Sequence, residues 1–503
     1  MKLSSMKKLL AVAATVAALL LSVPVFAQML PVSALKGKKV LFVTGEPEAD
    51  HPTDDGLVKK HLESLGFVVT MAKETDPATK ANGMDLVVIS STANAHVLQA
   101  TYRDVSIPVF TWNTYEYPEM RMTGPHLHTD FEVVDPVQHY AQSFSELYGY
   151  IASATSPITE SLGLKSELFG TLYLRPATVG WGKPAASARV VTNFEGFPRR
   201  AGIFTYEKDS SMYDDFVAPA RRVGFYLSDD NFHLLTAVYG PGAKDPELRA
   251  WYSGLKLFDA SVRWAVSPPV TPQAYDPSRL HEELAQAAKG KKLLFVERIN
   301  AGEGKEADEH MVAHLKALGF DVTIADQMDP QAKADGMDMV VLSATCSKYK
   351  LANKYRDTTV PVLVLEGLFA DTMRMAGRGR YVDYGEHGEE KESDDPPENY
   401  LNIVGAWSPM AAGLKPGLVK FTNETGTIKW ARPTPDATVI ATLPNEDEER
   451  AIFGYAKGAT MDGGFLAPAR RTLFPLDNPA FDDLTPQGVA LFDATVMWTL
   501  TGK

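Results

Sequence analysis

One short segment of the first half of the chain gathers residues that could bind a small molecule. The stretch TWNTYEYP places Trp112, Asn113, Tyr115 and Glu116 within five positions. Aromatic faces beside amide and carboxyl groups suit stacking on a sugar ring and hydrogen bonding to its hydroxyls. Packing in the protein core is the alternative explanation for the aromatic side chains. We therefore treat these four residues as candidate ligand-binding residues.

A second segment has the spacing of a metal site. In PHLHTDFE, the residues His126, His128 and Asp130 stand two positions apart. On a strand this spacing puts all three side chains on one face, as metal coordination requires. A solvated loop is the alternative. The corresponding stretch later in the chain, RGRYVDYG, keeps an aspartate at Asp383 but has neither histidine.

Arginines and the only cysteine complete the set of candidates. The motif APARR occurs twice and supplies Arg221 and Arg470, which could reach a cleft and bind a carboxylate through two hydrogen bonds. Ion pairing between structural elements is the alternative. Cys346 follows an apolar run, VVLSAT, but the matching position earlier in the chain is Ala93 and no histidine lies nearby to activate the thiol. We expect Cys346 to be structural.

The chain contains a long internal repeat. Residues 36–124 align with residues 289–377 at a constant offset of 253, with 37 identities in 89 positions. The rear parts match more loosely: FVAPARRVGFYL resembles FLAPARRTLFPL, and GLKLFDASVRWAV resembles GVALFDATVMWTL. Repeats of this length are domains rather than solenoid units. We expect one domain at 36–268, a proline-rich linker at 269–288 and a second domain at 289–503.

Each repeat alternates strand-like and helix-like segments. KKVLFV, FVVTMA, DLVVIS and IPVFTW read as strands, and residues 56–66 have helical apolar spacing that stops at a glycine. A short helix at about 280–288 is expected after the linker. Continuous apolar strands alternating with helices indicate a parallel sheet covered on both faces. The expected fold class is α/β: two tandem flavodoxin-like doubly wound domains with mainly parallel sheets.

Ligands of such sheets bind at the carboxyl ends of the strands. The loop after the first strand, TGEPEADHPTDDG, has no phosphate-binding glycine motif and carries five carboxylates, so nucleotide binding is not expected. Between 388 and 398 the run GEEKESDDPPE is expected to be a solvated loop. No cofactor is implied by any of these segments.

The ends and the charge of the chain bear on its location and partners. Residues 1–27 combine three lysines, an apolar run and a small-residue exit at Ala27, as in a secretory signal peptide. A retained membrane anchor is the alternative. The net charge of −13 disfavours nucleic acid and anionic membranes as partners. We expect an exported protein, periplasmic or extracellular, without a transmembrane segment after cleavage; the oligomeric state stays open.

Each repeat resembles the class I glutamine amidotransferase-like superfamily, in particular its ThuA-like branch. The resemblance rests on KKVLFV, the D-[LM]-[VM]-V-[IL]-S strand, the Pro-Val strand and the closing LFDA…W segment. The resemblance implies a nucleophilic cysteine just after the Pro-Val strand, but Asn113 and Glu366 occupy that position here. Glu366 could instead act as a general acid or base if burial raises its pKa, or could accept hydrogen bonds from a loop. We expect a non-catalytic module that binds a carbohydrate or small polar ligand. A sugar-directed hydrolase or isomerase and a structural accessory protein are the alternatives.

Overall fold

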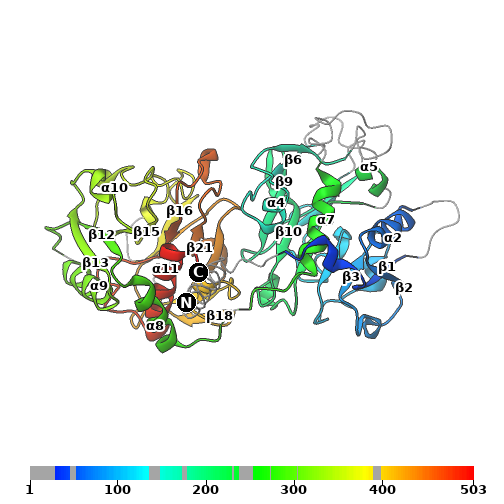
Figure 1. Cartoon of the computed structure of the whole chain (residues 1–503), viewed down its shortest axis with the longest axis horizontal. Coiled ribbons are helices and arrows are strands. Elements are labelled where there is room, and N and C mark those ends of the chain that lie inside the picture. Colours follow the sequence, from blue (N-terminus) through cyan, green and yellow to red (C-terminus); the bar gives the residue numbers. More distant parts are fainter. Residues whose placement is uncertain are drawn as a thin grey trace, which may run out of the picture.

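The computed structural model describes residues 29–45, 53–134, 148–172, 178–228, 231–236, 253–271, 273–302, 304–388 and 398–503. These residues form two lobes, each built around one mixed sheet (Figure 1). The predicted signal peptide and the acidic loop of residues 46–52 lie outside the described residues, as does most of the charge run at 388–398. Within the described ranges, no helix has both the length and the apolar character needed to cross a membrane.

The first sheet has a parallel half and an antiparallel half. Its order is β2-β1-β3-β4-β11-β10-β9-β6-β7, and β8 joins it through β10 and carries β5. Strands β2, β1, β3, β4 and β11 run parallel, in the order typical of flavodoxin-like sheets. The strands are β1 Lys39–Thr44, β2 Val68–Lys73, β3 Leu86–Ile89, β4 Val109–Thr111, β5 Phe131–Val134, β6 Tyr148–Ile151, β7 Leu168–Gly170, β8 Val179–Gly182, β9 Arg189–Phe194, β10 Phe197–Tyr206 and β11 Arg222–Gly224.

The second sheet repeats this strand order. It runs β13-β12-β14-β15-β22-β21-β20-β17-β18, with β19 on β21 and β16 on β19. Four strands of its parallel half, β12 to β15, come first in the sequence, the antiparallel strands follow, and β22 then returns beside β15 to complete the parallel half. The strands are β12 Lys292–Glu297, β13 Asp321–Asp326, β14 Met339–Leu342, β15 Val362–Val364, β16 Tyr384–His387, β17 Tyr400–Ile403, β18 Gly417–Lys420, β19 Ile428–Ala431, β20 Thr438–Leu443, β21 Glu446–Tyr455 and β22 Arg471–Leu473.

Helices cover the sheets. The longer ones are α2 Asp55–Ser64, α7 Gly254–Ala265, α8 Pro277–Ala288, α9 Lys305–Ala317 and α11 Pro486–Thr501. Shorter ones are α3 Ala95–Leu98, α4 Pro157–Glu160, α5 Phe232–Thr236 and α10 Lys348–Leu351, together with the 3₁₀ turns η1 Val32–Leu35, η2 Ala78–Ala81, η3 Thr114–Glu116, η5 Tyr213–Asp215, η7 Gln331–Ala334, η8 Gly367–Phe369, η9 Pro409–Ala411 and η10 Asp462–Gly464. All four residues of β3 and all four of β14 are buried, as expected for strands covered on both faces.

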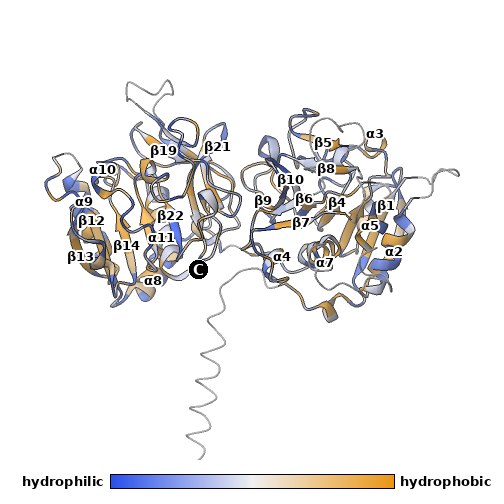
Figure 2. Cartoon of the chain, turned by 90° about the horizontal axis from the view of Figure 1, so that it is seen from above, coloured by the Kyte–Doolittle hydropathy of each residue, from blue (hydrophilic) through white to orange (hydrophobic). Residues whose placement is uncertain are grey.

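Each sheet separates two apolar layers (Figure 2). In the first lobe, Phe42 and Phe110 point to the layer that contains α7, while Leu41 and Val109 point to the opposite layer. In the second lobe, Phe295 faces the α11 layer and Leu294 faces the other. Neighbouring strand residues therefore alternate between two cores, because side chains of a strand project to opposite faces.

The two lobes meet through their antiparallel halves. Asp436, which is 1% exposed, accepts hydrogen bonds from the hydroxyls of Ser153 and Thr155 at 2.7 and 2.6 Å. Ser211 N donates to Val404 O at 3.1 Å. At the more exposed rim, Glu448 lies 3.0 Å from Lys183 Nζ and 3.4 Å from Arg199 Nη2. Buried hydroxyl–carboxylate contacts thus form the centre of the inter-lobe contact, and ion pairs form its edge.

The structure confirms the α/β fold class and adds detail to the expected elements. The helix expected at 56–66 is α2, which begins at Asp55 and ends at Ser64. The helix expected at 280–288 is α8, which starts earlier because Asp276 caps it by accepting from Arg279 N at 3.1 Å. Its residues Leu284 and Ala288 lie in the core of the second lobe. The antiparallel strands of each lobe were not anticipated.

Candidate functional site

A cavity of about 350 Å³ lies at the carboxyl edge of the first sheet. Strands β3, β4 and β11 run parallel, so the residues that follow them meet at this edge. The lining residues that the structure describes are apolar or neutral polar, and none is charged: Ser91, Trp112, Thr114, Tyr115, Val133, Thr178, Leu227, Ser228 and Asn231. The cavity therefore has the position and size of a small-molecule site.

Two aromatic residues of the TWNTYEYP segment line the cavity in different ways. Trp112 is 2% exposed and packs against Phe42, Phe110 and Phe258 with ring centroids 5.8 to 6.1 Å apart. Tyr115 is 53% exposed and stands edge-on to Phe131 at 6.3 Å. Trp112 is thus a core residue that forms part of the cavity wall, whereas Tyr115 offers a free aromatic surface at its mouth.

Polar groups in the cavity wall have hydrogen-bonding capacity to spare. Ser91 Oγ is buried and has no hydrogen-bond partner within the described part of the chain, and the buried Thr114 hydroxyl has only a weak contact with the Tyr117 hydroxyl. Asn231 donates from Nδ2 to Thr178 O, which leaves its side-chain oxygen available as an acceptor. A buried hydroxyl without a partner is unfavourable. A ligand with hydroxyl or amide groups would satisfy these atoms.

Asn113 and Glu116 have other surroundings. Asn113 is 1% exposed and donates from Nδ2 to Ala93 O at 2.6 Å, so it ties the end of β4 to the loop after β3. Glu116 is fully buried, and neither of its carboxyl oxygens has a hydrogen-bond partner among the described residues. Burial raises the pKa of Glu116 to about 9, with a smaller contribution from Glu119. Neither side chain is part of the cavity lining.

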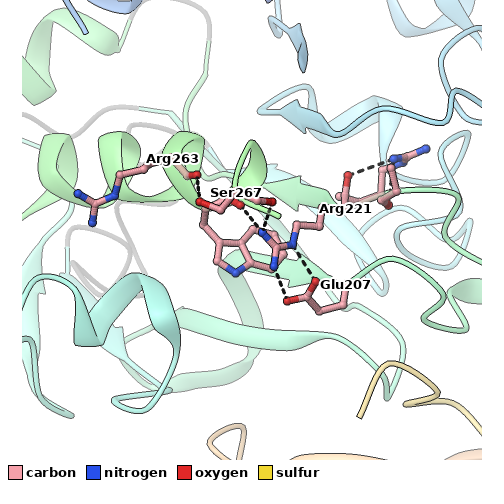
Figure 3. A network of polar contacts seen from close by, with 7 residues as sticks. Glu207, Arg221, Arg263 and Ser267 are labelled. Atoms are coloured by element: carbon pink, nitrogen blue, oxygen red, sulfur yellow. Dashed lines mark hydrogen bonds and ion pairs between the residues drawn. The ribbon is translucent and has the colours of Figure 1, made fainter. Parts of the chain in front are cut away.

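Arg221 is engaged inside the protein (Figure 3). Its guanidinium binds Glu207 through two hydrogen bonds, at 2.7 and 2.9 Å, and its Nη1 donates to Trp264 O and Ser267 O. The last two acceptors lie at the C-terminal end of α7, where helix carbonyls lack partners. Arg470 does the same for α11, donating to Thr499 O at 2.8 Å and Leu500 O at 2.6 Å. Both arginines therefore donate to carbonyls at helix ends, and only Arg221 also forms the ion pair between elements that was the alternative to ligand binding.

The histidine segment divides into two separate pairs. His126 Nδ1 lies 3.0 Å from Asp130, and His128 Nδ1 lies 2.7 Å from Glu132. Both imidazoles are about 70% exposed. Across the described ranges, no group of three or more His, Cys, Asp or Glu side chains is arranged to hold a metal ion. The three residues proposed from sequence are therefore not brought together at one point.

In the second lobe, the corresponding strand edge holds an ion-pair network. Lys429 Nζ lies 3.0 Å from Glu366 and 2.9 Å from Asp477, and Glu366 also accepts from Leu368 N at 2.9 Å. Burial raises the pKa of Glu366 against the opposing effect of Lys429. Burial lowers the pKa of Lys429, but the facing carboxylates outweigh it and hold that pKa above its usual value. Both oxygens of Glu366 are therefore engaged within the protein.

Cys346 is a buried thiol, 5% exposed, that donates to Val296 O at 3.4 Å. Burial and the nearby carboxylates of Asp308, Asp326, Glu297 and Glu366 raise its pKa well above the usual thiol range. A nucleophilic thiolate is disfavoured under these conditions. This agrees with the structural role that the sequence indicated.

Sequence reasoning missed part of the cavity wall. Ser91 directly follows the predicted strand DLVVIS, whereas Ser228 and Asn231 follow β11, and the loop after this late strand was not considered. The signal was present in the sequence, because SDDN directly follows the apolar run VGFYL. Assigning that run to the parallel half of the sheet would have placed its loop at the same edge.

Comparisons with known proteins leave the chain without an assigned family. No protein-family model and no curated protein match it. Three similar solved structures are a candidate GMP synthase component of Thermoplasma acidophilum (17% identity), the N-terminal domain of mmIFT52 (9%) and a ThuA-like protein of Parabacteroides merdae (18%). Each match covers 42 to 43% of this chain and 91 to 99% of the other, with TM-scores of 0.26 to 0.28. At these values the likenesses carry no argument about function.

Proposed function

We propose that the first lobe is a non-catalytic module that binds a small neutral polyol, with a monosaccharide unit as the best-fitting class. The observation that carries this proposal is the cavity at the carboxyl ends of β3, β4 and β11. Its wall combines the exposed ring of Tyr115 with the hydroxyls of Ser91, which has no partner among the described residues, and Thr114, which only weakly contacts Tyr117. Sugars present one apolar face and a rim of hydroxyls, which this combination complements.

The absence of charge from the described lining favours a neutral ligand. A phosphate or carboxylate would find no cation there to offset its desolvation. The proposal includes the resemblance to ThuA-like and amidotransferase-like proteins, but only for the scaffold. The nucleophile is missing, because Asn113 stands at the cysteine position and its side chain binds the loop after β3. Export to the periplasm or the extracellular space, where free saccharides occur, is proposed from the N-terminal segment.

The test starts with thermal shift and isothermal titration of the full mature chain with D-glucose, D-galactose and N-acetylglucosamine. A ligand that binds the native state raises the melting temperature by mass action. Tyr115→Ala and Thr114→Val should weaken binding at least tenfold while the protein stays folded, because they remove the stacking surface and one hydroxyl. Trp112→Ala is unsuitable here, since deleting a core indole costs about 3–5 kcal/mol.

Tyr349→Ala provides the matched control. Tyr349 is 91% exposed on α10 in the second lobe, so its loss should change neither binding nor stability. Unchanged affinity in Tyr115→Ala and Thr114→Val, or no binding of any of the three saccharides, would reject the proposal. The alternative of a sugar-directed hydrolase using Glu366 stays a prediction, and turnover abolished by Glu366→Gln with folding intact would support it.

A further inference from the structure

A second cavity lies between the two lobes. It shares no lining residue with the cavity at the strand edge of the first lobe. An outer hollow of about 270 Å³ and an inner one of about 50 Å³ both touch Val270, Trp407, Ser408 and Pro409. Because they share these four residues, we treat them as one continuous space, the inter-lobe cavity. Cavities between domains are common sites for small ligands.

The inner end of the inter-lobe cavity is lined by Arg189, from β9 of the first lobe. Its Nη2 donates to Thr438 Oγ1 of the second lobe at 2.8 Å, and its Nη1 makes longer contacts of 3.3 and 3.5 Å with Ser153 and Thr155 hydroxyls. Among the described residues, no carboxylate lies within ion-pair distance of Arg189. Its guanidinium is therefore held only by hydroxyls.

Three carboxylates act electrostatically on Arg189 without a direct ion pair, namely Asp436, Glu207 and Glu160, and the first two have other hydrogen-bond partners. Asp436 interacts with Arg189 at longer range and accepts hydrogen bonds from Ser153, Thr155 and Thr460 N. Glu207, which also lines the cavity, is bound by both branches of Arg221. Burial lowers the pKa of Arg189 against the opposing effect of Asp436, Glu207 and Glu160. An anion placed in the cavity would supply the missing direct partner.

Tryptophan side chains form part of the wall of the inter-lobe cavity, among polar and aliphatic residues. Trp264, Trp407 and Trp498 line the inner part, and Leu280 and Met497 line the outer part. Trp407 Nε1 is buried and has no hydrogen-bond partner within the described ranges. An apolar body in the cavity would lie against Trp407, which lines both parts, and an acceptor on it could take the indole N–H. In the outer part Glu283 lies 3.6 Å from Arg279, so its charge is also paired.

We propose that the inter-lobe cavity binds a small aromatic or aliphatic carboxylate, with the anion on Arg189 and the apolar body against Trp407. Arginine binds carboxylates through two parallel hydrogen bonds, and such charge-assisted bonds are stronger than neutral ones. Because residues of both lobes line the cavity, the ligand would also strengthen the contact between the lobes. This site is independent of the saccharide cavity proposed above.

The experiment compares phenylacetate with the neutral 2-phenylethanol on the full mature chain, by tryptophan fluorescence and thermal shift. Phenylacetate should quench fluorescence and raise the melting temperature, with affinity at least tenfold higher than that of 2-phenylethanol. Arg189→Gln should reduce phenylacetate affinity about tenfold or more, the loss expected for one charge-assisted contact. Trp407→Phe should reduce the quenching and weaken binding less.

Arg199→Gln is the matched control, since Arg199 also reaches the other lobe but its side chain is 70% exposed and does not line the cavity. It should leave phenylacetate binding unchanged. Equal affinity for the acid and the alcohol, no binding of phenylacetate, or full affinity in Arg189→Gln would overturn the proposal. If Arg189→Gln does not fold, the comparison of the two probes on the unaltered protein decides the matter.

Discussion

At the carboxyl edge of each sheet, a residue that follows the fourth strand faces a residue of a neighbouring antiparallel strand. In each lobe one member of this pair is a glycine, but the two lobes place the glycine on opposite sides. In the first lobe, Thr114 projects from the segment after β4, and β8 carries Gly180 opposite it; a Cβ at Gly180 would lie 1.9 Å from Thr114 Oγ1. In the second lobe the arrangement is reversed: Gly367 lies opposite Lys429, and a Cβ at Gly367 would lie 2.7 Å from the Lys429 side chain. The threonine side chain lines a cavity in the first lobe, whereas at the corresponding place in the second lobe the lysine ammonium lies against two carboxylates.

The supports behind these edges are the same in both lobes. Asp55 accepts from the hydroxyls of Ser90 and Thr92 at 2.7 and 2.8 Å. Asp308 accepts from Ser343 and Thr345 at 2.6 and 2.7 Å in the second lobe. The comparison teaches that the scaffold is kept while the edge has diverged, one lobe towards an open site and the other towards an internal ion-pair network.

The largest effect is expected from breaking that network. Lys429→Met leaves the buried Glu366 without its cation and should lower the free energy of unfolding by about 3 kcal/mol or more. Urea denaturation at pH 7 measures the loss. The loss should shrink as the pH falls, because protonated Glu366 needs no counter-charge. The double variant Glu366→Gln/Lys429→Met should recover part of it; a neutral effect of Lys429→Met would contradict the account.

The next largest effect on stability is expected from replacing Glu116. The corresponding residue of the second lobe is Phe369. The folded-state pKa of Glu116, about 9, lies above the ordinary value of 4.5, so the native state holds a proton that the unfolded chain releases. Stability should therefore fall as the pH rises from about 4.5 to about 9. Glu116→Gln should remove this fall and exceed the unaltered protein by more than about 2 kcal/mol at pH 9. Urea denaturation at pH 5, 7 and 9 tests it.

Glu119→Gln is the control for this pH series, because Glu119 is exposed. It should retain most of the decline in stability between pH 5 and pH 9. A decline that persists unchanged in Glu116→Gln would show that other groups cause it.

A smaller difference is expected between two equivalent histidine–aspartate pairs. His61 Nε2 lies 2.6 Å from Asp259, and His314 Nε2 lies 2.7 Å from Asp493. The Asp493 side chain is 5% exposed and that of Asp259 is 34% exposed. Asp493→Asn should therefore cost about 2 kcal/mol and Asp259→Asn less than about 1 kcal/mol by urea denaturation. Equal costs would show that burial does not distinguish the pairs.

The smallest effect concerns Cys346, whose counterpart in the first lobe is the buried Ala93. Cys346→Ala should lower the free energy of unfolding by about 1 kcal/mol, because only a sulfur atom and one weak hydrogen bond are lost. Ligand binding should not change. In the native protein the thiol should react with iodoacetamide much more slowly than in 6 M urea, and equal rates would contradict its burial.

The parallel half of each sheet could be predicted because its strands are continuous apolar runs, such as VVI at 87–89, bounded by clear turn signals. The antiparallel half could not, because strands such as β9 (RVVTNF) and β10 (FPRRAGIFTY) mix polar and apolar residues without a regular period and belong to the part of the repeat that aligns loosely. Trp112 and Tyr115 were found by residue type alone. Only tertiary structure separates them, since one ring fills the core and the other faces the cavity mouth.

The arginines show the opposite limitation. The repeated APARR motif suggested binding, but its spacing does not reveal that the closing helix of each lobe ends beside it. The carbonyls at the helix end attract the guanidinium, and this contact forms only after the chain has returned to the sheet from far along the sequence. The role of these residues could not be read from the sequence because, apart from the Glu207 carboxylate bound by Arg221, their acceptors are backbone atoms, which leave no sequence signal.

One titration tests the central claim that the first lobe has an open ligand cavity and the second has filled its equivalent. The saccharide with the largest melting shift is titrated calorimetrically into the unaltered protein and into Gly180→Lys/Thr114→Gly, which gives the first lobe the residue pair of the second. The account predicts one molecule bound per unaltered chain and none to the folded variant. Binding of two molecules per chain, or undiminished binding to the variant, would contradict it.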